Sequence, residues 1–155
     1  MVITTKLFKM KRIDYIKYEL SNGGREKYFN TGRKKDYVGD CAVRACALAL
    51  EQDYMKTLRD LSDIAVNELG IPNANSIFTL TVYMERKGWE RISLIEDRKK
   101  KVMYKHKSIL SEDENYIFDV RVGYGSHWTA VVKGVNRDTW LCQDKYAQGY
   151  WRKIN

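Results

Sequence analysis

The stretch GDCAVRACALAL, Gly39–Leu50, decides the fold that this sequence predicts. A Gly39-Asp40 turn delivers Cys41 to the start of an apolar, alanine-rich segment that favours a helix over Ala42–Leu50. Asp40 is a suitable N-cap residue, and a helix that is apolar on nearly all sides is typically buried. Because the positive end of a helix dipole stabilises an anion, Cys41 lies where a thiolate is favoured.

Two further helices are expected after this segment, over Tyr54–Leu69 and Ser76–Lys87. Asp53 caps the first of them, and Asn75 opens the second. Gly70 is the expected end of the first helix, because glycine readily adopts the left-handed conformation that follows a helix.

From Trp89 onward the apolar residues alternate with polar ones, which is the period of a strand. The expected strands are Trp89–Ile95, Tyr116–Val122, His127–Lys133, Thr139–Asp144 and Tyr150–Ile154, with a turn over Gly134–Asp138. Helices in the first half and strands in the second predict an α+β fold, with the helices packed on one face of an antiparallel sheet.

The N-terminal part of the chain predicts a β-hairpin ahead of this core. Ile13–Leu20 alternates, Ser21–Gly24 has the composition of a turn, and Glu26–Phe29 reads as extended. The chain of 155 residues is expected to form a single domain, residues 1–155, in which residues 1–37 are an N-terminal hairpin and loop extension.

The composition limits the partners and the compartment. The chain carries 28 Lys and Arg against 20 Asp and Glu, a net charge of +8, which permits attraction to nucleic acid or to an acidic protein. A soluble, lysine-rich surface is the simpler interpretation. Three cysteines are too few for a disulfide scaffold and indicate a reducing, cytoplasmic setting. The absence of a signal-like or membrane-spanning apolar stretch predicts no membrane partner.

A catalytic cysteine needs a general base and a group that orients the base. His127, one of two histidines, begins an expected strand and is the natural base for Cys41. If that strand and the strand ending at Asp144 form a hairpin with a two- or four-residue loop, His127 and Asp144 project from the same face. The predicted set is therefore Cys41 as nucleophile, His127 as base and Asp144 as orienting group.

This set, with cysteine opening a buried helix and histidine and aspartate following on strands, resembles the papain-like cysteine peptidase fold. The spacing is most similar to compact bacterial and phage forms, such as the peptidase domains of bacteriocin exporters. The resemblance implies a hydrolase that cleaves a peptide, isopeptide or other amide bond through a cysteine acyl-enzyme, in the cytoplasm of a bacterial cell, with a protein or peptide substrate. It covers roughly Val38–Asp144.

One feature of such enzymes is missing from the sequence. They carry a Gln a few residues before the nucleophile, where its amide stabilises the oxyanion, and the preceding residues TGRKKDYVGD contain none. The alternative function is therefore a catalytically silent papain-fold protein that binds a host protein or nucleic acid through a basic, aromatic surface. Residues Tyr124, Trp128, Tyr146, Tyr150 and Trp151 are the aromatic candidates for such a surface.

Several residues have simpler interpretations as parts of the scaffold. Cys46 and Cys142 are expected in the core, and Cys41 itself has the alternative of a buried, inert thiol. Arg44 is expected to pair with a carboxylate or to extend toward solvent, and His106 to be solvated. No cofactor is expected. A zinc site of Cys41, Cys142 and His127 lacks the paired ligand spacing that such sites show.

Overall fold

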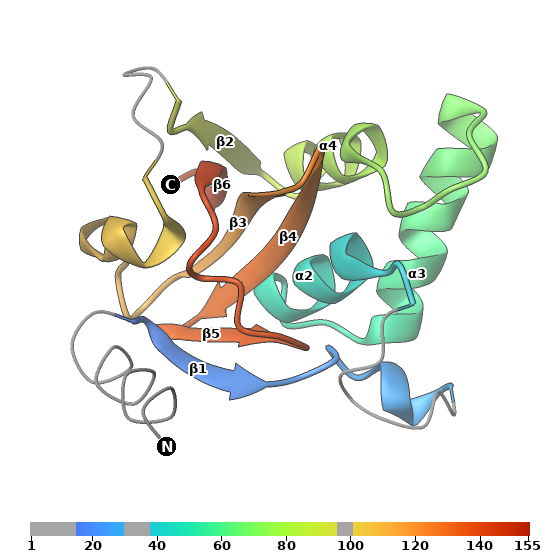
Figure 1. Cartoon of the computed structure of the whole chain (residues 1–155). Coiled ribbons are helices and arrows are strands. Elements are labelled where there is room, and N and C mark those ends of the chain that lie inside the picture. The colour runs from blue at the N-terminus through green and yellow to red at the C-terminus, as the bar shows by residue number, and fades with distance from the viewer. Residues whose placement is uncertain (1–14, 30–37, 96–100) are drawn as a thin grey trace.

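A computed structural model describes residues 15–29, 38–95 and 101–155, which form an α+β fold (Figure 1). The helical elements are η1 (Arg25–Lys27), α2 (Cys41–Ala49), α3 (Tyr54–Asp63), η2 (Ile64–Leu69), α4 (Ile77–Arg86) and η3 (Met103–Ile109). The strands are β1 (Lys17–Leu20), β2 (Trp89–Ser93), β3 (Asn115–Val122), β4 (Gly125–Val132), β5 (Val135–Asp138) and β6 (Ala147–Lys153).

The three predicted helices are confirmed, with differences at their ends. α3 continues into the single π-helical segment η2, so that together they span the predicted range, and Gly70 ends them with a left-handed φ of 67°. Ser76, rather than Asn75, is the N-cap of α4, because its hydroxyl accepts a hydrogen bond from the Phe78 backbone N–H. The Asn75 side chain therefore does not cap α4.

The six strands form one sheet in the order β1-β5-β4-β3-β6-β2. Every neighbouring pair is antiparallel except β1 and β5, which are parallel. β4 and β5 are joined by the two-residue turn Lys133-Gly134, and both residues have positive φ, 49° and 82°. That pattern is the type I′ turn, whose twist matches the twist of a hairpin.

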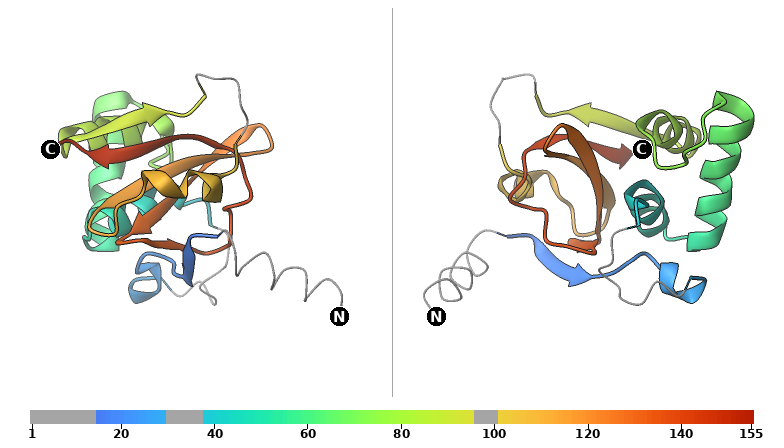
Figure 2. Two further views of the ribbon diagram at one scale, coloured as in Figure 1. Left: turned by 90° about the vertical axis from the view of Figure 1, so that its left-hand side faces the viewer. Right: turned by 45° about the vertical axis from the view of Figure 1, so that its right-hand side comes forward.

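Helices α2, α3 and α4 cover one face of the sheet, and η3 lies on the other (Figures 1 and 2). On the helical face, the alanine-rich α2 packs closely on β4, and Trp128, Ala130 and Val132 point toward it. On the opposite face Phe118, Val131 and Met103 belong to a second buried cluster. Because α2 is buried between β4 and α3, its first residue is held firmly relative to the strands.

The predicted N-terminal hairpin is wrong within the described residues. β1 pairs with β5, and residues 25–27 form a 3₁₀ turn instead of a returning strand. Tertiary contacts explain the difference, since Gln143 makes hydrogen bonds to both backbone groups of Ile16, at 2.8 and 2.9 Å. The Arg25 side chain is buried against Asp40, which draws the segment toward α2. Ile13 and Asp14 lie outside the described residues.

The prediction for the segment after β4 is also wrong. Residues 135–138 were expected as a turn but form strand β5, and residues 139–144, expected as a strand, form bends and a turn. Asn136 and Asp138 are residues typical of turns. They are held as a strand because β5 lies between β1 and β4 and bonds to both.

Among the described residues, none of the helices has the length and hydrophobicity that crossing a bilayer requires.

Candidate active site

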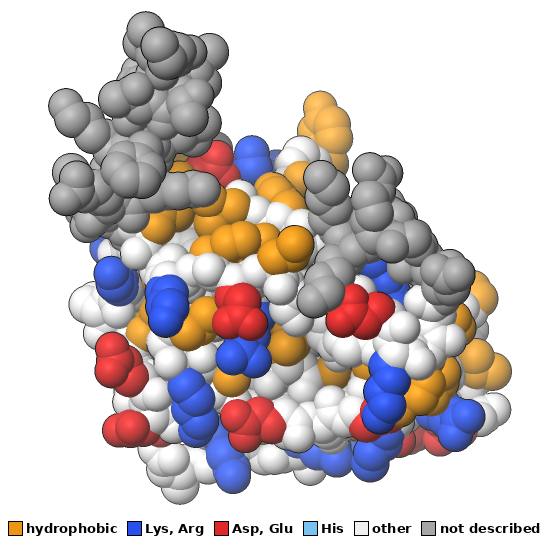
Figure 3. All heavy atoms as spheres, turned by 90° about the horizontal axis from the view of Figure 1, so that it is seen from below, with side chains coloured by type: hydrophobic (Ala, Val, Ile, Leu, Met, Phe, Trp, Pro, Cys, Tyr) orange, Lys and Arg blue, Asp and Glu red, His pale blue; other side chains and the backbone are white. Residues whose placement is uncertain are grey.

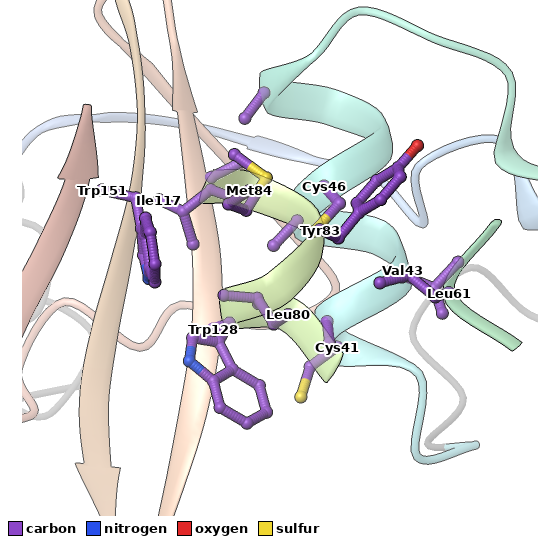
Figure 4. Close-up of a cluster of buried hydrophobic side chains, with 14 of the residues drawn as sticks. Cys41, Val43, Cys46, Leu61, Leu80, Tyr83, Met84, Ile117, Trp128 and Trp151 are labelled. Atoms are coloured by element: carbon purple, nitrogen blue, oxygen red, sulfur yellow. The ribbon is translucent and has the colours of Figure 1, made fainter. Parts of the chain in front are cut away.

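Cys41 is the first residue of α2, and its side chain meets His127 of β4. The residue is only 8% exposed, and its thiol lies close enough to the His127 ring and to the backbone N–H of Trp128 for both to lower its pKa. Figure 4 shows the Cys41 sulfur on the side of α2 that faces Trp128, whereas Val43 points toward Leu61. The predicted pair of thiol and imidazole is thus brought together by the packing of α2 on β4.

Asp138, at the end of β5, holds the other side of the His127 ring. Its Oδ2 lies 2.6 Å from His127 Nε2, and both side chains are buried. Because Nε2 is engaged by the carboxylate, Nδ1 is the ring nitrogen left for the Cys41 sulfur. Asp138 Oδ1 accepts a hydrogen bond of 2.6 Å from the Thr139 backbone N–H. The carboxylate is therefore fixed at both oxygens.

The prediction that Asp144 orients His127 is wrong, although the register argument behind it is sound. The β4–β5 turn has two residues, and the observed pairs Ala130 with Arg137 and Val132 with Val135 have odd sums. The next step in that register sets Asp138 opposite Thr129, diagonal to His127 on the same face. Asp144 lies six residues beyond the end of β5, and it is exposed in a turn.

The three groups shift one another's pKa values in the directions that an ion pair requires. Burial raises the pKa of the Cys41 thiol, but the hydrogen bonds from His127 and Trp128 and the charge of His127 lower it more. Burial likewise lowers the pKa of His127, and its hydrogen bonds to Asp138, Cys142 and Cys41 outweigh that effect, so that the pKa is raised. These shifts favour a thiolate beside an imidazolium.

The pKa of Asp138 is held low despite burial, which would raise it, by the hydrogen bond and charge of His127 and by the charge of Arg44. Arg44 lies 3.3 Å from Asp138 and also pairs with Asp40, which lies four residues earlier, just before α2. Arg44 was expected to pair with a carboxylate, and it pairs with two. The helix that begins with Cys41 is thus bound by charge to the strand that ends with Asp138.

Asp40 is the N-cap residue of α2, as predicted, but its side chain makes no capping hydrogen bond. Its carboxylate instead pairs with Arg25 at 3.0 Å and accepts a hydrogen bond of 2.8 Å from the Tyr54 hydroxyl. The capping oxygen comes instead from Asn75, whose Oδ1 accepts the Ala42 backbone N–H at 2.6 Å.

Asn75 is the site residue that the sequence did not reveal. Its Oδ1 also lies 3.5 Å from the Cys41 sulfur, and it stands in the loop that leads into α4. The only signal in the sequence is its place before a helix, which does not say that the loop crosses the start of another helix.

Two more residues border the His127 ring. The ring of Trp140, which is 36% exposed, is tilted relative to the ring of His127, with the two ring centroids 5.0 Å apart. It shields the imidazole from solvent. Cys142 is fully buried, 3.7 Å from Asp138 Oδ2. Burial raises its pKa, as does the charge of Asp138, against the opposing effect of His127. Cys142 therefore remains a thiol at the base of the site.

The ligand atoms of His127, Asp138 and Cys142 lie within 4.8 Å of one another. A tetrahedral zinc ion keeps its nitrogen and oxygen ligands about 3.3 Å apart, given metal–ligand bonds of about 2.0–2.1 Å. The 2.6 Å separation of His127 Nε2 and Asp138 Oδ2 is too short for that geometry and fits a hydrogen bond.

A cavity of about 420 Å³ lies beside the start of α2. Gly39, Asp40 and Asn75 form its edge nearest Cys41, and its other walls are mostly apolar, formed by Phe29, Val38, Val43, Tyr54, Leu58 and Ala74, among others. No residue of β4 or β5 is among those that line it. Cys41 itself does not line the cavity, which adjoins it through its chain neighbours Gly39 and Asp40 and through Asn75.

The remaining candidates belong to the scaffold. Cys46 is buried in the core, as expected, and Trp128, Tyr150 and Trp151 are buried as well, whereas Tyr124 and Tyr146 are exposed. His106 was expected to be solvated, but it is 9% exposed, and burial together with the charge of Lys101 lowers its pKa.

Comparisons of this chain with protein-family models, with curated proteins and with solved structures return no match.

We expect alkylation of the thiols by iodoacetamide to be confined to Cys41 near neutral pH. Its pKa is lowered whereas burial raises the pKa of Cys46 and Cys142, and the thiolate is the form that reacts. As pH rises, Cys41 reacts with a midpoint below that of free cysteine in the same buffer. Peptide mass mapping after labelling at several pH values measures this, and equal labelling of the three cysteines would contradict it.

Proposed function

We propose that this protein is a cysteine hydrolase with a papain-like arrangement, acting on an amide or ester bond through an acyl-enzyme. The observation that carries the proposal is that the Asp138 carboxylate lies 2.6 Å from His127 Nε2 while the His127 ring lies near enough to the Cys41 thiol for each to shift the other's pKa. A buried helix with cysteine at its start, packed on strands that bear histidine and aspartate, is similar to the order of elements in papain-like enzymes.

In the first step the Cys41 thiolate attacks the carbonyl carbon, and the S–C bond forms as electrons move to the oxygen. When the tetrahedral intermediate collapses, the C–N or C–O bond breaks and His127 gives its proton to the leaving group. Water then attacks the thioester, with neutral His127 as base. The acyl group leaves as the acid, and the proton that His127 took from water restores the imidazolium–thiolate pair. Asp138 stabilises the imidazolium throughout.

We infer from the position of the cavity that it holds the acyl part of the substrate. The leaving group must lie toward His127, since His127 protonates it, so the acyl part extends to the other side of Cys41. The cavity begins there, at Gly39 and Asp40. The Asp40 carboxylate is already paired with Arg25 and Arg44, and the other walls are mostly apolar. We therefore propose that the acyl part carries an apolar side chain.

The alternative, a silent binding protein, finds less support. On the face shown in Figure 3, Lys and Arg side chains are interspersed with Asp and Glu. The dense basic stretches Lys9–Arg12 and Arg33–Lys35, and Arg98–Lys100, lie outside the described residues. Three of the five aromatic candidates are buried. An intact and buried thiol–imidazole–carboxylate set is not needed for binding.

The expected result of a direct test is an acyl adduct on Cys41. The protein is mixed with the 4-nitrophenyl esters of N-acetylphenylalanine and N-acetylserine, and nitrophenol release is followed together with intact mass. Burying an apolar side chain contributes about 1.5–3 kcal/mol, so the phenylalanine ester should react about tenfold faster or more.

Two variants serve as the matched pair for this test. Cys41→Ala should form no adduct, and Cys46→Ala should behave as the wild type. An adduct on another residue, or none, would remove the hydrolase proposal. Equal rates for the two esters would leave the hydrolase and remove only the apolar preference.

A further inference from the structure

We propose that Asn75 supplies a hydrogen bond to the oxyanion that forms when Cys41 attacks a carbonyl. This inference rests on the proposed function and extends it to a residue that lies after the nucleophile in the chain. The sequence lacks a Gln shortly before Cys41, and the loop before α4 brings a side-chain amide to the same sulfur.

The hydrogen bond to Ala42 settles how the Asn75 amide is oriented. The Ala42 backbone N–H is a donor and needs an acceptor, so the atom 2.6 Å from it is Oδ1. The two N–H donors of Nδ2 then lie on the side of the amide away from the Ala42 N–H. No hydrogen bond of Nδ2 to another described residue occurs, so these donors are available to a bound substrate.

The position of Asn75 relative to the sulfur matches the place where charge develops. Asn75 Oδ1 lies 3.5 Å from Cys41 Sγ, and the amide is therefore next to any carbonyl carbon that bonds to that sulfur. In the proposed reaction His127, which Asp138 holds, protonates the leaving group, so the leaving group lies toward the imidazole. The carbonyl oxygen is thus directed toward the start of α2, where the Cys41 backbone N–H, which has no acceptor within the helix, is the second donor.

Anchoring by Ala42 makes the amide a preorganised donor. A group that is already held in place does not have to reorient when the negative charge appears, and this is the condition under which such donors are most effective. Asn73 contributes to this order, because its Oδ1 accepts the Asn75 backbone N–H at 2.8 Å.

The experiment compares two reactions of the same sulfur. Alkylation by iodoacetamide passes through no oxyanion, whereas acylation by 4-nitrophenyl acetate does. The ratio of the two rate constants cancels the thiolate fraction, which Asn75 substitutions can alter. The variants are Asn75→Ala, which removes the whole amide, and Asn75→Asp, which keeps an oxygen for Ala42 but has no donor. Asn67→Ala, an exposed asparagine on η2, is the control.

We expect both Asn75 variants to lower the acylation-to-alkylation ratio by about 10²–10³-fold, the effect of losing one oxyanion donor. Asn67→Ala should keep the wild-type ratio. If the two rates fall together, so that the ratio is unchanged, Asn75 only supports the start of α2 and the inference is overturned. If wild-type Cys41 is alkylated but never acylated, the proposed hydrolase itself is overturned, and that result differs from either outcome for the variants.

Discussion

Asp138→Asn is expected to lower turnover of an activated ester by about 10²–10⁴-fold, the range associated with loss of the general acid–base function. The asparagine keeps the shape of the side chain but no longer carries the charge that stabilises protonated His127. The pKa of His127 should fall, that of Cys41 should rise, and the pH profile of alkylation should move upward. Steady-state rates and alkylation rates measured between acidic and alkaline pH record both effects.

Asp144→Asn is the matched control for that experiment. It makes the same chemical change at a residue that is exposed and lies in a turn. It should leave both the turnover and the pH profile at wild-type values. A large effect of Asp144→Asn together with a small effect of Asp138→Asn would mean that the assignment of the orienting carboxylate is wrong.

Arg44→Met is expected to lower the free energy of unfolding by about 3–5 kcal/mol, the largest loss of stability among the variants proposed. The substitution keeps much of the side-chain volume and removes the charge that lies between Asp40 and Asp138. Those carboxylates expose 9% and 2% of their side chains, so little water is available to replace the guanidinium. Most single domains have a total stability of about 5–15 kcal/mol, and such a loss is therefore a large part of it.

Urea unfolding followed by tryptophan fluorescence measures this loss. Arg59→Met, on the exposed side of α3, is the control and should change stability by no more than about 0.5 kcal/mol. Equal unfolding midpoints for the two variants would show that the Arg44 network contributes little. Loss of folding by Arg44→Met alone would agree with the prediction.

Local sequence patterns were sufficient to predict the helices and most strands. The apolar period of α2, α3 and α4 and their flanking Gly and Asp residues depend on neighbours within one or two turns. The same holds for the position of Cys41 at the start of α2 and of His127 near the start of β4, the two residues that the sequence predicted and the fold brings together.

The strand β5 and the pairing of β1, which the sequence did not predict, depend on partners far away in the chain. β5 contains Asn136 and Asp138, which favour turns on their own, and it is extended because β1 and β4 both bond to it. β1 in turn needs Gln143, which is distant in sequence, to hold the backbone of Ile16. The misplacement of β5 is why Asp144 was predicted in place of Asp138, although the rule for which residues share a face was correct.

The sequence by itself determined that a cysteine opens a buried helix and that a histidine follows on a later strand, because helix dipoles and periodicity are local properties. Only the tertiary structure decided which carboxylate and which amide join them. Asp138 reaches His127 through a hairpin register set by Lys133-Gly134, and Asn75 reaches Cys41 through the packing of one helix start against another. Such contacts join residues far apart in the chain, and no local pattern encodes them.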